Sequence, residues 1–183
     1  LASTAAWPSD APPAEPQIVV QSLRAGLHLI SGAGSNVAVW HGPDGTVLVD
    51  AGVAALAPKL LAAIEKIAPG PVRVVISTHW HPDHTGGNEH FAGSGSVLVA
   101  HDNVRARLSE PQTVATYDLE VPAAAAGALP IVTFDDALSL HLNGDRLAAL
   151  HVEAAHTDGD LLLWWEDANV VHVGDIYYSG MYP

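Results

Sequence analysis

A dense cluster of metal-binding side chains at positions 79–84 constrains this chain more than any other feature of its sequence. The cluster reads His79-Trp80-His81-Pro82-Asp83-His84. Its imidazoles and carboxylate together suit zinc or a similar divalent cation. The prolyl bond argues against a regular helix here, and in extended backbone His79 and His81 point the same way and can reach one ion. The cluster therefore predicts a metal site on a loop.

The apolar run at 72–78, immediately before the cluster, is typical of a buried strand. The cluster would then follow the carboxyl end of a strand, where ligands of open α/β sheets usually bind. Earlier strand signals, separated by turn residues, predict an antiparallel meander with strands at 18–21, 27–30, 36–40 and 46–49. Apolar residues at helical spacing predict a helix over 54–67.

The second half of the chain is dominated by strand signals. After a short helix at 85–91, a strand at 96–100 and a helix at 101–108, strands are predicted at 131–134, 137–142, 146–151, 161–165 and 170–173. Asn143-Gly144 predicts a two-residue hairpin, and the alanine-rich stretch at 111–130 is expected to be an irregular insert or lid. This order of elements predicts one α+β domain, a sandwich of mixed sheets with helices outside.

Two further motifs look suited to supply metal ligands. His156 lies in a loop between predicted strands, and Asp175 lies at the end of the strand at 170–173. A tetrahedral zinc held by His79 and His81 still needs a third protein ligand. A carboxylate at a strand end can bridge two cations about 3.5–4 Å apart.

These motifs together resemble those of the metallo-β-lactamase-fold hydrolases. The cluster meets the signature His-x-His-x-Asp-His in full, and Thr85-Gly86-Gly87-Asn88 follows it, as in many members. Motifs at 48–52, 156–160 and 174–175 occur in the family's order, so the resemblance runs from about Ile18 to the last residue. It implies an αββα sandwich over residues 18–183.

The resemblance also implies which residues hold metal. The first ion would be held by His79, His81 and His156. The second would be held by Asp83 and His84, with Asp175 bridging both ions. Asp50 would orient these ligands from behind without binding metal itself.

One departure from the family's pattern concerns the second ion. Members usually carry a further histidine on a late strand, and this chain has no histidine after His172. We therefore expect the second site to lack a ligand. We also expect the C-terminal part of the domain, including a wall of the cleft, to be truncated.

The resemblance implies a zinc-dependent hydrolase with one or two ions. A metal-bound hydroxide would attack the carbonyl of a small-molecule substrate such as a thioester, lactone or β-lactam, with Asp83 as the catalytic residue that orients it. Aspartate at position 175 favours the glyoxalase II-like members over the cysteine-containing β-lactamases. Weaker candidates for substrate contacts are Trp80, Tyr177 and Tyr178.

Two alternatives stay open beside the hydrolase. Family relatives use the same ligands to hold iron and oxidise persulfides or reduce dioxygen, so an iron-dependent oxidoreductase is the first. A non-catalytic metal-binding fragment is the second, because of the missing histidine. Iron at about one equivalent in protein purified without added metal would favour the oxidoreductase.

Composition excludes several other classes of function. The 183-residue chain has a formal net charge of −13 and only scattered cations, so no basic stripe is available for nucleic acid. No stretch approaches the roughly 20 apolar residues of a membrane span, and the lack of cysteine rules out disulfides and a cysteine nucleophile. Residues 1–17, rich in Ala, Pro and Ser, are expected to form a flexible leader. Such a leader favours a periplasmic or secreted protein over a cytoplasmic one, and the composition assigns no oligomeric state.

Overall fold

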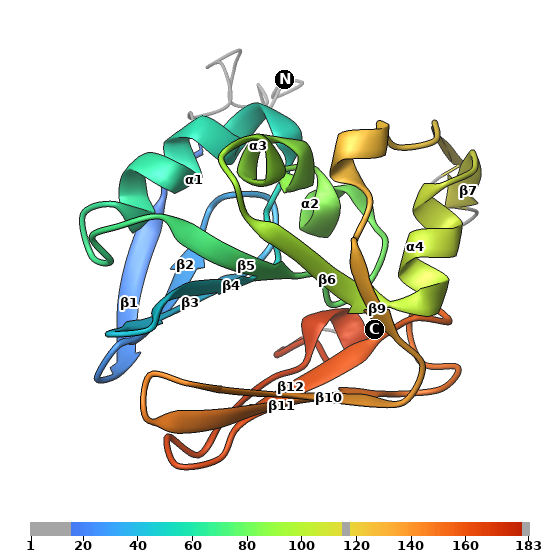
Figure 1. Cartoon of the computed structure of the whole chain (residues 1–183). Coiled ribbons are helices and arrows are strands. Elements are labelled where there is room, and N and C mark those ends of the chain that lie inside the picture. The colour runs from blue at the N-terminus through green and yellow to red at the C-terminus, as the bar shows by residue number, and fades with distance from the viewer. Residues whose placement is uncertain (1–15, 115–117, 181–183) are drawn as a thin grey trace, which may run out of the picture.

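The structure, a computed structural model, describes residues 16–114 and 118–180, and its two larger β-sheets pack face to face (Figure 1). The first sheet has the strand order β1-β2-β3-β4-β5-β6-β9. Its strands are β1 (Val19–Arg24), β2 (Leu27–Ser31), β3 (Val37–Gly42), β4 (Gly45–Val49), β5 (Val72–Ile76), β6 (Val97–His101) and β9 (Val132–Phe134). The second sheet contains β10 (Ala137–Leu142), β11 (Asp145–His151), β12 (Leu161–Trp165) and β13 (Val170–His172).

The first sheet is mixed. Strands β1 to β4 pair antiparallel, which confirms the predicted meander, whereas β4, β5, β6 and β9 pair in parallel. Parallel pairs need crossover connections, and these run through α1 (Ala57–Ile64), α3 (Asn88–Gly93) and α4 (Asp102–Leu108). Because parallel strands end at the same edge of a sheet, the residues that follow β4 and β5 meet there.

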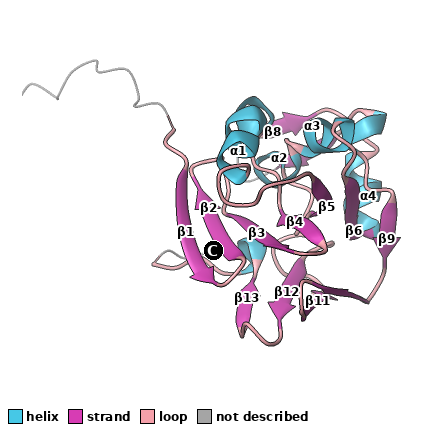
Figure 2. Ribbon diagram, turned by 60° about the vertical axis from the view of Figure 1, so that its left-hand side comes forward, coloured by secondary structure: helices cyan, strands magenta, loops and turns pink. Residues whose placement is uncertain are grey.

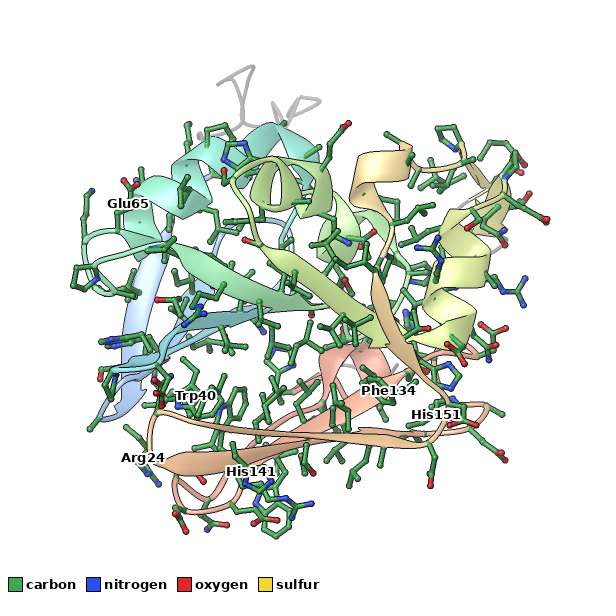
Figure 3. The ribbon with its side chains drawn as sticks, viewed as in Figure 1. Arg24, Trp40, Glu65, Phe134, His141 and His151 are labelled. Atoms are coloured by element: carbon green, nitrogen blue, oxygen red, sulfur yellow. The ribbon has the colours of Figure 1, made fainter. Side chains whose placement is uncertain are left out.

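The core forms two main layers, one on each face of the first sheet. One layer lies between this sheet and the helices α1 and α3, and the other fills the space between the two sheets. In the second layer Trp40 and Trp165 meet edge to face, with ring centroids 6.3 Å apart. Figure 3 shows Trp40 between the two sheets, which are thus held together by large apolar side chains.

The α+β fold with packed sheets is confirmed. Figure 2 shows α1, α2 (Pro82–Thr85) and α3 gathered on one side of the first sheet. The second sheet is wholly antiparallel, and within the described part of the chain no α-helix covers its outer face (Figure 1). None of the helices among these residues is long and apolar enough to cross a bilayer.

The cluster at 79–84 departs from the expected backbone. Pro82 begins the short helix α2 instead of preventing one, so the prediction of a loop through the whole cluster was wrong. Proline is well suited to the first helical position, because the N–H that it lacks would have no intrahelical partner there. The predicted helix over 54–67 also differs, since it begins as the 3₁₀ turn η1 (Ala54–Leu56) and α1 ends at Ile64.

The insert at 111–130 is more regular than predicted. β7 (Gln112–Val114) and β8 (Leu119–Val121) pair antiparallel, and the 3₁₀ turn η3 (Ala126–Ala128) follows them. Short strands of this length give too little alternation to be recognised from sequence. Most of the expected leader, residues 1–15, lies outside the described residues.

Candidate metal centre

The candidate centre lies where two neighbouring parallel strands of the first sheet end. Asp50 follows β4, and its amide donates to the Ile76 carbonyl at the end of β5 (2.8 Å). Its φ is +66°, in the left-handed region that aspartate tolerates better than most residues. The cluster at 79–84 begins shortly after Ile76, so the carboxylate and the imidazoles come from adjacent strand ends.

Two glycines explain the sequence that follows the cluster. A Cβ on Gly87 would lie 2.3 Å from the Ala51 carbonyl oxygen, and one on Gly86 would lie 2.5 Å from the Ala54 amide nitrogen. Only residues without a side chain allow this close approach. It lets the Ala51 amide donate to the His84 carbonyl (2.8 Å), which ties the end of the cluster to the segment after β4.

Three imidazoles converge into a first group. His79 Nε2 lies 3.1 Å from His81 Nδ1, and His156 Nε2 lies 2.9 Å from the same atom. The ligand atoms of all three lie within 4.8 Å of one another. A tetrahedral zinc with Zn–N bonds of about 2.0–2.1 Å holds its nitrogens about 3.3–3.4 Å apart. The spacing of this group therefore fits a zinc-sized ion.

His156 reaches the group from a loop between β11 and β12. The buried carboxylate of Asp160 accepts hydrogen bonds from the amides of His156 (2.7 Å) and Thr157 (2.6 Å) and from the Thr157 hydroxyl (2.8 Å). The sequence His-Thr-Asp-Gly-Asp thus forms a loop that is held from within by its last residue.

A second group contains His79, His84 and Asp175. His84 Nε2 lies 3.2 Å from Asp175 Oδ1 and 3.5 Å from Asp83 Oδ2. The other Asp175 oxygen lies 3.7 Å from His156 Nε2. Asp175 therefore stands between the two groups, where a carboxylate can contact two ions, and His79 borders both.

Asp50 supports the centre from behind. One of its oxygens accepts from the Thr78 amide (2.7 Å), and the other accepts from the Thr78 hydroxyl (2.9 Å) and lies 2.8 Å from His84 Nδ1. This contact directs the Nδ1 proton of His84 to Asp50 and leaves Nε2 facing the centre, as the neutral ligand requires. Asp50 is fully buried and does not belong to either group of converging ligand atoms.

The pKa values of the two most buried imidazoles shift in opposite directions. Burial and the neighbouring imidazoles, His84 first, lower the pKa of His79 to about 2. Burial also acts to lower the pKa of His84, but the charge of Asp50 and hydrogen bonds to Asp175, Asp50 and Asp83 outweigh it and raise that pKa to about 12. Carboxylates thus make this place favourable for a cation, whereas His79 stays neutral, as a metal ligand must. The donor set fits a divalent cation.

The aromatic residues expected at the substrate site have different surroundings. Tyr178 donates from its hydroxyl to Asp175 (2.6 Å), and Tyr177 is largely exposed. Trp80 is only 8 % exposed and packs in a cluster with Val104 of α4, with its ring 4.4 Å from the ring of His81. Trp80 therefore lies between His81 and α4, and its contact with a substrate stays a prediction.

A cavity of about 510 Å³ adjoins the second group. Its polar lining includes Asp83, His84, His172 and Asp175. Its apolar walls come from both sheets and include Leu23, Leu27, Leu29, Trp165, Val170 and Val171. These walls could not be predicted from the sequence, because each residue is an ordinary strand residue and only the packing of the sheets brings them together. Thr78 was missed too, although it directly precedes His79.

Comparison with known proteins gives one family over most of the chain. Residues 31–182 match the model of the metallo-beta-lactamase superfamily. The linear primary-alkylsulfatase of a Pseudomonas species is 28% identical over 175 residues, covering 77% of this chain and 33% of that protein. The human metallo-beta-lactamase domain-containing protein 1 is 38% identical over 71 residues, covering 38% of this chain and 26% of that protein. The chain thus spans about a third or less of the length of these curated relatives.

Solved structures show the same fold. A metallo-β-lactamase with a HARLDQ motif from Cronobacter sakazakii superposes with a TM-score of 0.74 at 22% identity, covering 93% of this chain and 67% of that one. MEM-A1, a subclass B3 metallo-β-lactamase from a soil metagenome library, gives 0.67 at 19% identity, covering 82% and 58%. At identities of 19% and 22%, the likeness to these two structures establishes the fold alone.

Proposed function

Because the chain belongs to the metallo-β-lactamase superfamily, we propose that it is a metal-dependent hydrolase of a small carbonyl or ester substrate. The observation that carries the proposal is the convergence of imidazoles from distant segments. His156 Nε2 lies 2.9 Å from His81 Nδ1, although 75 positions separate the two residues. Three imidazoles whose ring nitrogens converge on one point are what a shared metal ion requires.

The proposed metal is zinc, with two ions as the full complement. The first would be held by His79, His81 and His156, and the second by Asp83 and His84, with Asp175 between them. Bound zinc lowers the pKa of a coordinated water toward neutrality and polarises an oxygen of the substrate.

The chain's own residues would orient water and move its proton. A hydrogen bond to His84 holds the pKa of Asp83 below its usual value, so this half-exposed carboxylate is ionised at neutral pH. An ionised carboxylate at this place can orient the attacking water and accept its proton. Asp50 fixes the tautomer of His84, and Tyr178 fixes the carboxylate of Asp175 by donating to it.

The cavity supports a substrate with an apolar part. Its walls carry leucine, valine and tryptophan side chains, and Asp83, His84 and Asp175 lie in the same lining. A thioester, lactone or β-lactam with an apolar substituent fits this arrangement. A linear alkyl sulfate joins them, because the name of one curated relative is linear primary-alkylsulfatase.

The test combines metal analysis with a substrate panel. We expect protein purified without added metal to contain zinc and to hydrolyse at least one of a thioester, a lactone, a chromogenic cephalosporin and an alkyl sulfate. Turnover should stop with chelator and return with zinc. Iron with little zinc would favour the oxidoreductase, and the absence of chelator-sensitive turnover on every substrate would favour the non-catalytic fragment.

A matched pair of variants links the activity to the centre. His156→Ala removes one imidazole of the first group and should abolish turnover and zinc retention. His141→Ala makes the same change on exposed β10, away from the centre (Figure 3), and should leave both unchanged.

A further inference from the structure

The loop that carries His156 is held by side chains that the metal chemistry does not use. Arg107, from α4, directs two nitrogens of its guanidinium at the Asp158 carboxylate, with Nη2 2.8 Å and Nε 3.1 Å from Oδ2. The carbonyl of the same residue accepts from Asn103 Nδ2 (2.7 Å) and lies 3.2 Å from His151 Nε2. Hydrogen bonds thus hold both the side chain and the backbone carbonyl of Asp158.

The next residue of the loop packs directly on α4. A Cβ on Gly159 would lie 2.8 Å from Val104 Cγ2 and 3.2 Å from the Val104 amide nitrogen. Val104 is fully buried in the cluster that also contains Trp80. Trp80 packs against His81, and Gly159 lies in the loop that carries His156. Helix α4 therefore contacts residues that support both His81 and His156.

The start of α4 is itself fixed to the second sheet. His101 Nδ1 accepts from the Asn103 amide (3.1 Å), and the His101 ring stacks on His151 with centroids 3.7 Å apart and planes 20° apart. Figure 3 shows His151 at the end of the second sheet, and the ring of Phe134 on β9 lies 6.3 Å from the His101 ring. The end of β6, the start of α4 and the end of β11 therefore form one connected block.

We propose that Asn103, Val104 and Arg107, which we term the α4 anchor, position His156 for metal binding. The anchor holds Asp158 and Gly159, and Asp160 holds the amide of His156. The loop therefore has little freedom between the anchor and the imidazole. The inference rests on the proposed function, since it takes His79, His81 and His156 as a metal site.

The expected effect follows from what supporting residues contribute to metal sites. Loss of such a partner typically costs 10–100-fold in metal affinity. Arg107 and Asp158 are each nearly half exposed, so we expect the lower end, about tenfold, for Arg107→Gln. Arg107→Lys keeps the charge without the two-pronged contact and should fall between Arg107→Gln and the wild type.

The experiment measures metal binding and loop order separately from turnover. Zinc affinity is determined by competition with a chromophoric chelator, and the geometry of the site by the absorption spectrum of the cobalt form. Amide hydrogen exchange at His156 and Thr157 is followed in metal-free protein. Arg107→Gln and Gly159→Ala should weaken zinc binding, alter the cobalt spectrum and speed this exchange.

The control is Arg105→Gln, which removes the same charge from the same helix. The Arg105 guanidinium donates to the Pro130 carbonyl in another segment, so its loss should change none of the three readouts. Thermal unfolding of every variant verifies folding. If Arg107→Gln does not fold, Gly159→Ala still displaces the loop from α4, and it does so without a change of charge.

The two proposals fail in different ways. A wild type that retains no metal at this centre overturns the proposed function and the anchor with it. A wild type that binds zinc, with Arg107→Gln and Gly159→Ala matching it in affinity, cobalt spectrum and exchange, overturns the anchor alone.

Discussion

Asp50 is the residue whose role depends most on an unusual backbone conformation. Its φ of +66° turns its carboxylate beneath His84, where it accepts from the amide and hydroxyl of Thr78. The position is fully buried, so each lost hydrogen bond leaves a polar group without solvent. Charge and backbone conformation can be separated here, because asparagine tolerates the same φ.

We expect Asp50→Asn to lose the second metal equivalent and keep the first. The amide cannot supply the negative charge that favours a cation near His84, and the free energy of unfolding should fall by about 1–3 kcal/mol because a buried hydrogen-bonding partner is lost. Metal content after gel filtration and urea unfolding test this. Asp167→Asn, at an exposed position, is the control. Full retention of both ions by Asp50→Asn would refute the assigned role.

A histidine pair on β2 and β3, away from the candidate metal centre, predicts how the free energy of unfolding depends on pH. His28 and His41 stack with their Nε2 atoms 3.2 Å apart, and burial and then the charge of His41 lower the pKa of His28 below 6.5. The unfolded chain therefore binds the proton more readily, so His28 contributes stability above about pH 6.5 that is lost as the pH falls toward its lower folded pKa.

Replacing His41 should reduce this loss. In His41→Gln the neighbouring charge is absent, so the fall in unfolding free energy between about pH 7.5 and 5.5 should be smaller than in the wild type. Urea unfolding at several pH values measures it. His141→Gln on exposed β10 should keep the wild-type slope. Equal slopes for His41→Gln and the wild type would contradict the expectation.

Single residues also show how far sequence reasoning could go at the site. The structure brings His79, His81 and His156 together, and each of them lies in a short motif that could be recognised on its own. The hydrogen bonds from the Thr78 hydroxyl to Asp50 and from Arg107 to Asp158 could not be foreseen, because these contacts depend on the tertiary structure. Trp80 packs with Val104, and its contact with a substrate stays a prediction, because an aromatic residue beside candidate metal ligands can face either the cleft or the core.

At the level of elements, most strands were predicted within a residue or two at each end, although β1 ends at Arg24, three residues beyond the predicted bound. β10 and β12 have the predicted bounds, and Asn143 and Gly144 form the predicted turn with φ values of +51° and +80°. α2 was missed because proline can begin a helix as well as exclude one. Local pattern thus located most elements, whereas the pairing of β5, β6 and β9 in parallel requires the whole sheet.

The turn at Asn143-Gly144 offers a test of backbone strain without steric complication. A Cβ on Gly144 would meet nothing within 4 Å, so Gly144→Ala should destabilise through its positive φ alone, by about 1–2 kcal/mol. Gly93, in α3, also has open space but an ordinary φ, so Gly93→Ala should stabilise by up to about 1 kcal/mol. Urea unfolding of both variants measures the difference. Effects of the same sign would contradict this account.

At the scale of the whole molecule, the candidate metal ligands and the cavity depend on how the sheets meet. The ligand groups draw on residues after β5, β11 and β13, and the cavity takes its walls from the first sheet and from β12 and β13. No sequence window contains residues of both sheets, so the cavity could not be predicted from sequence, whereas the convergence of His79, His81 and His156 could. If substrates place an apolar chain in this cavity, their reactivity must depend on its free volume.

The free volume of the cavity predicts how kcat/KM depends on the length of the substrate's apolar chain. Each buried methylene contributes about 0.8 kcal/mol, so kcat/KM for acyl thioesters should rise about fourfold per methylene until the cavity is filled. Leu29→Trp, on a wall facing the second sheet, should remove this gain for long chains and leave the acetyl thioester nearly unchanged. Leu150→Trp, at an exposed position on β11, is the matched control, with thermal unfolding to verify folding. An unchanged chain-length profile in Leu29→Trp would show that the substrate's apolar part binds elsewhere.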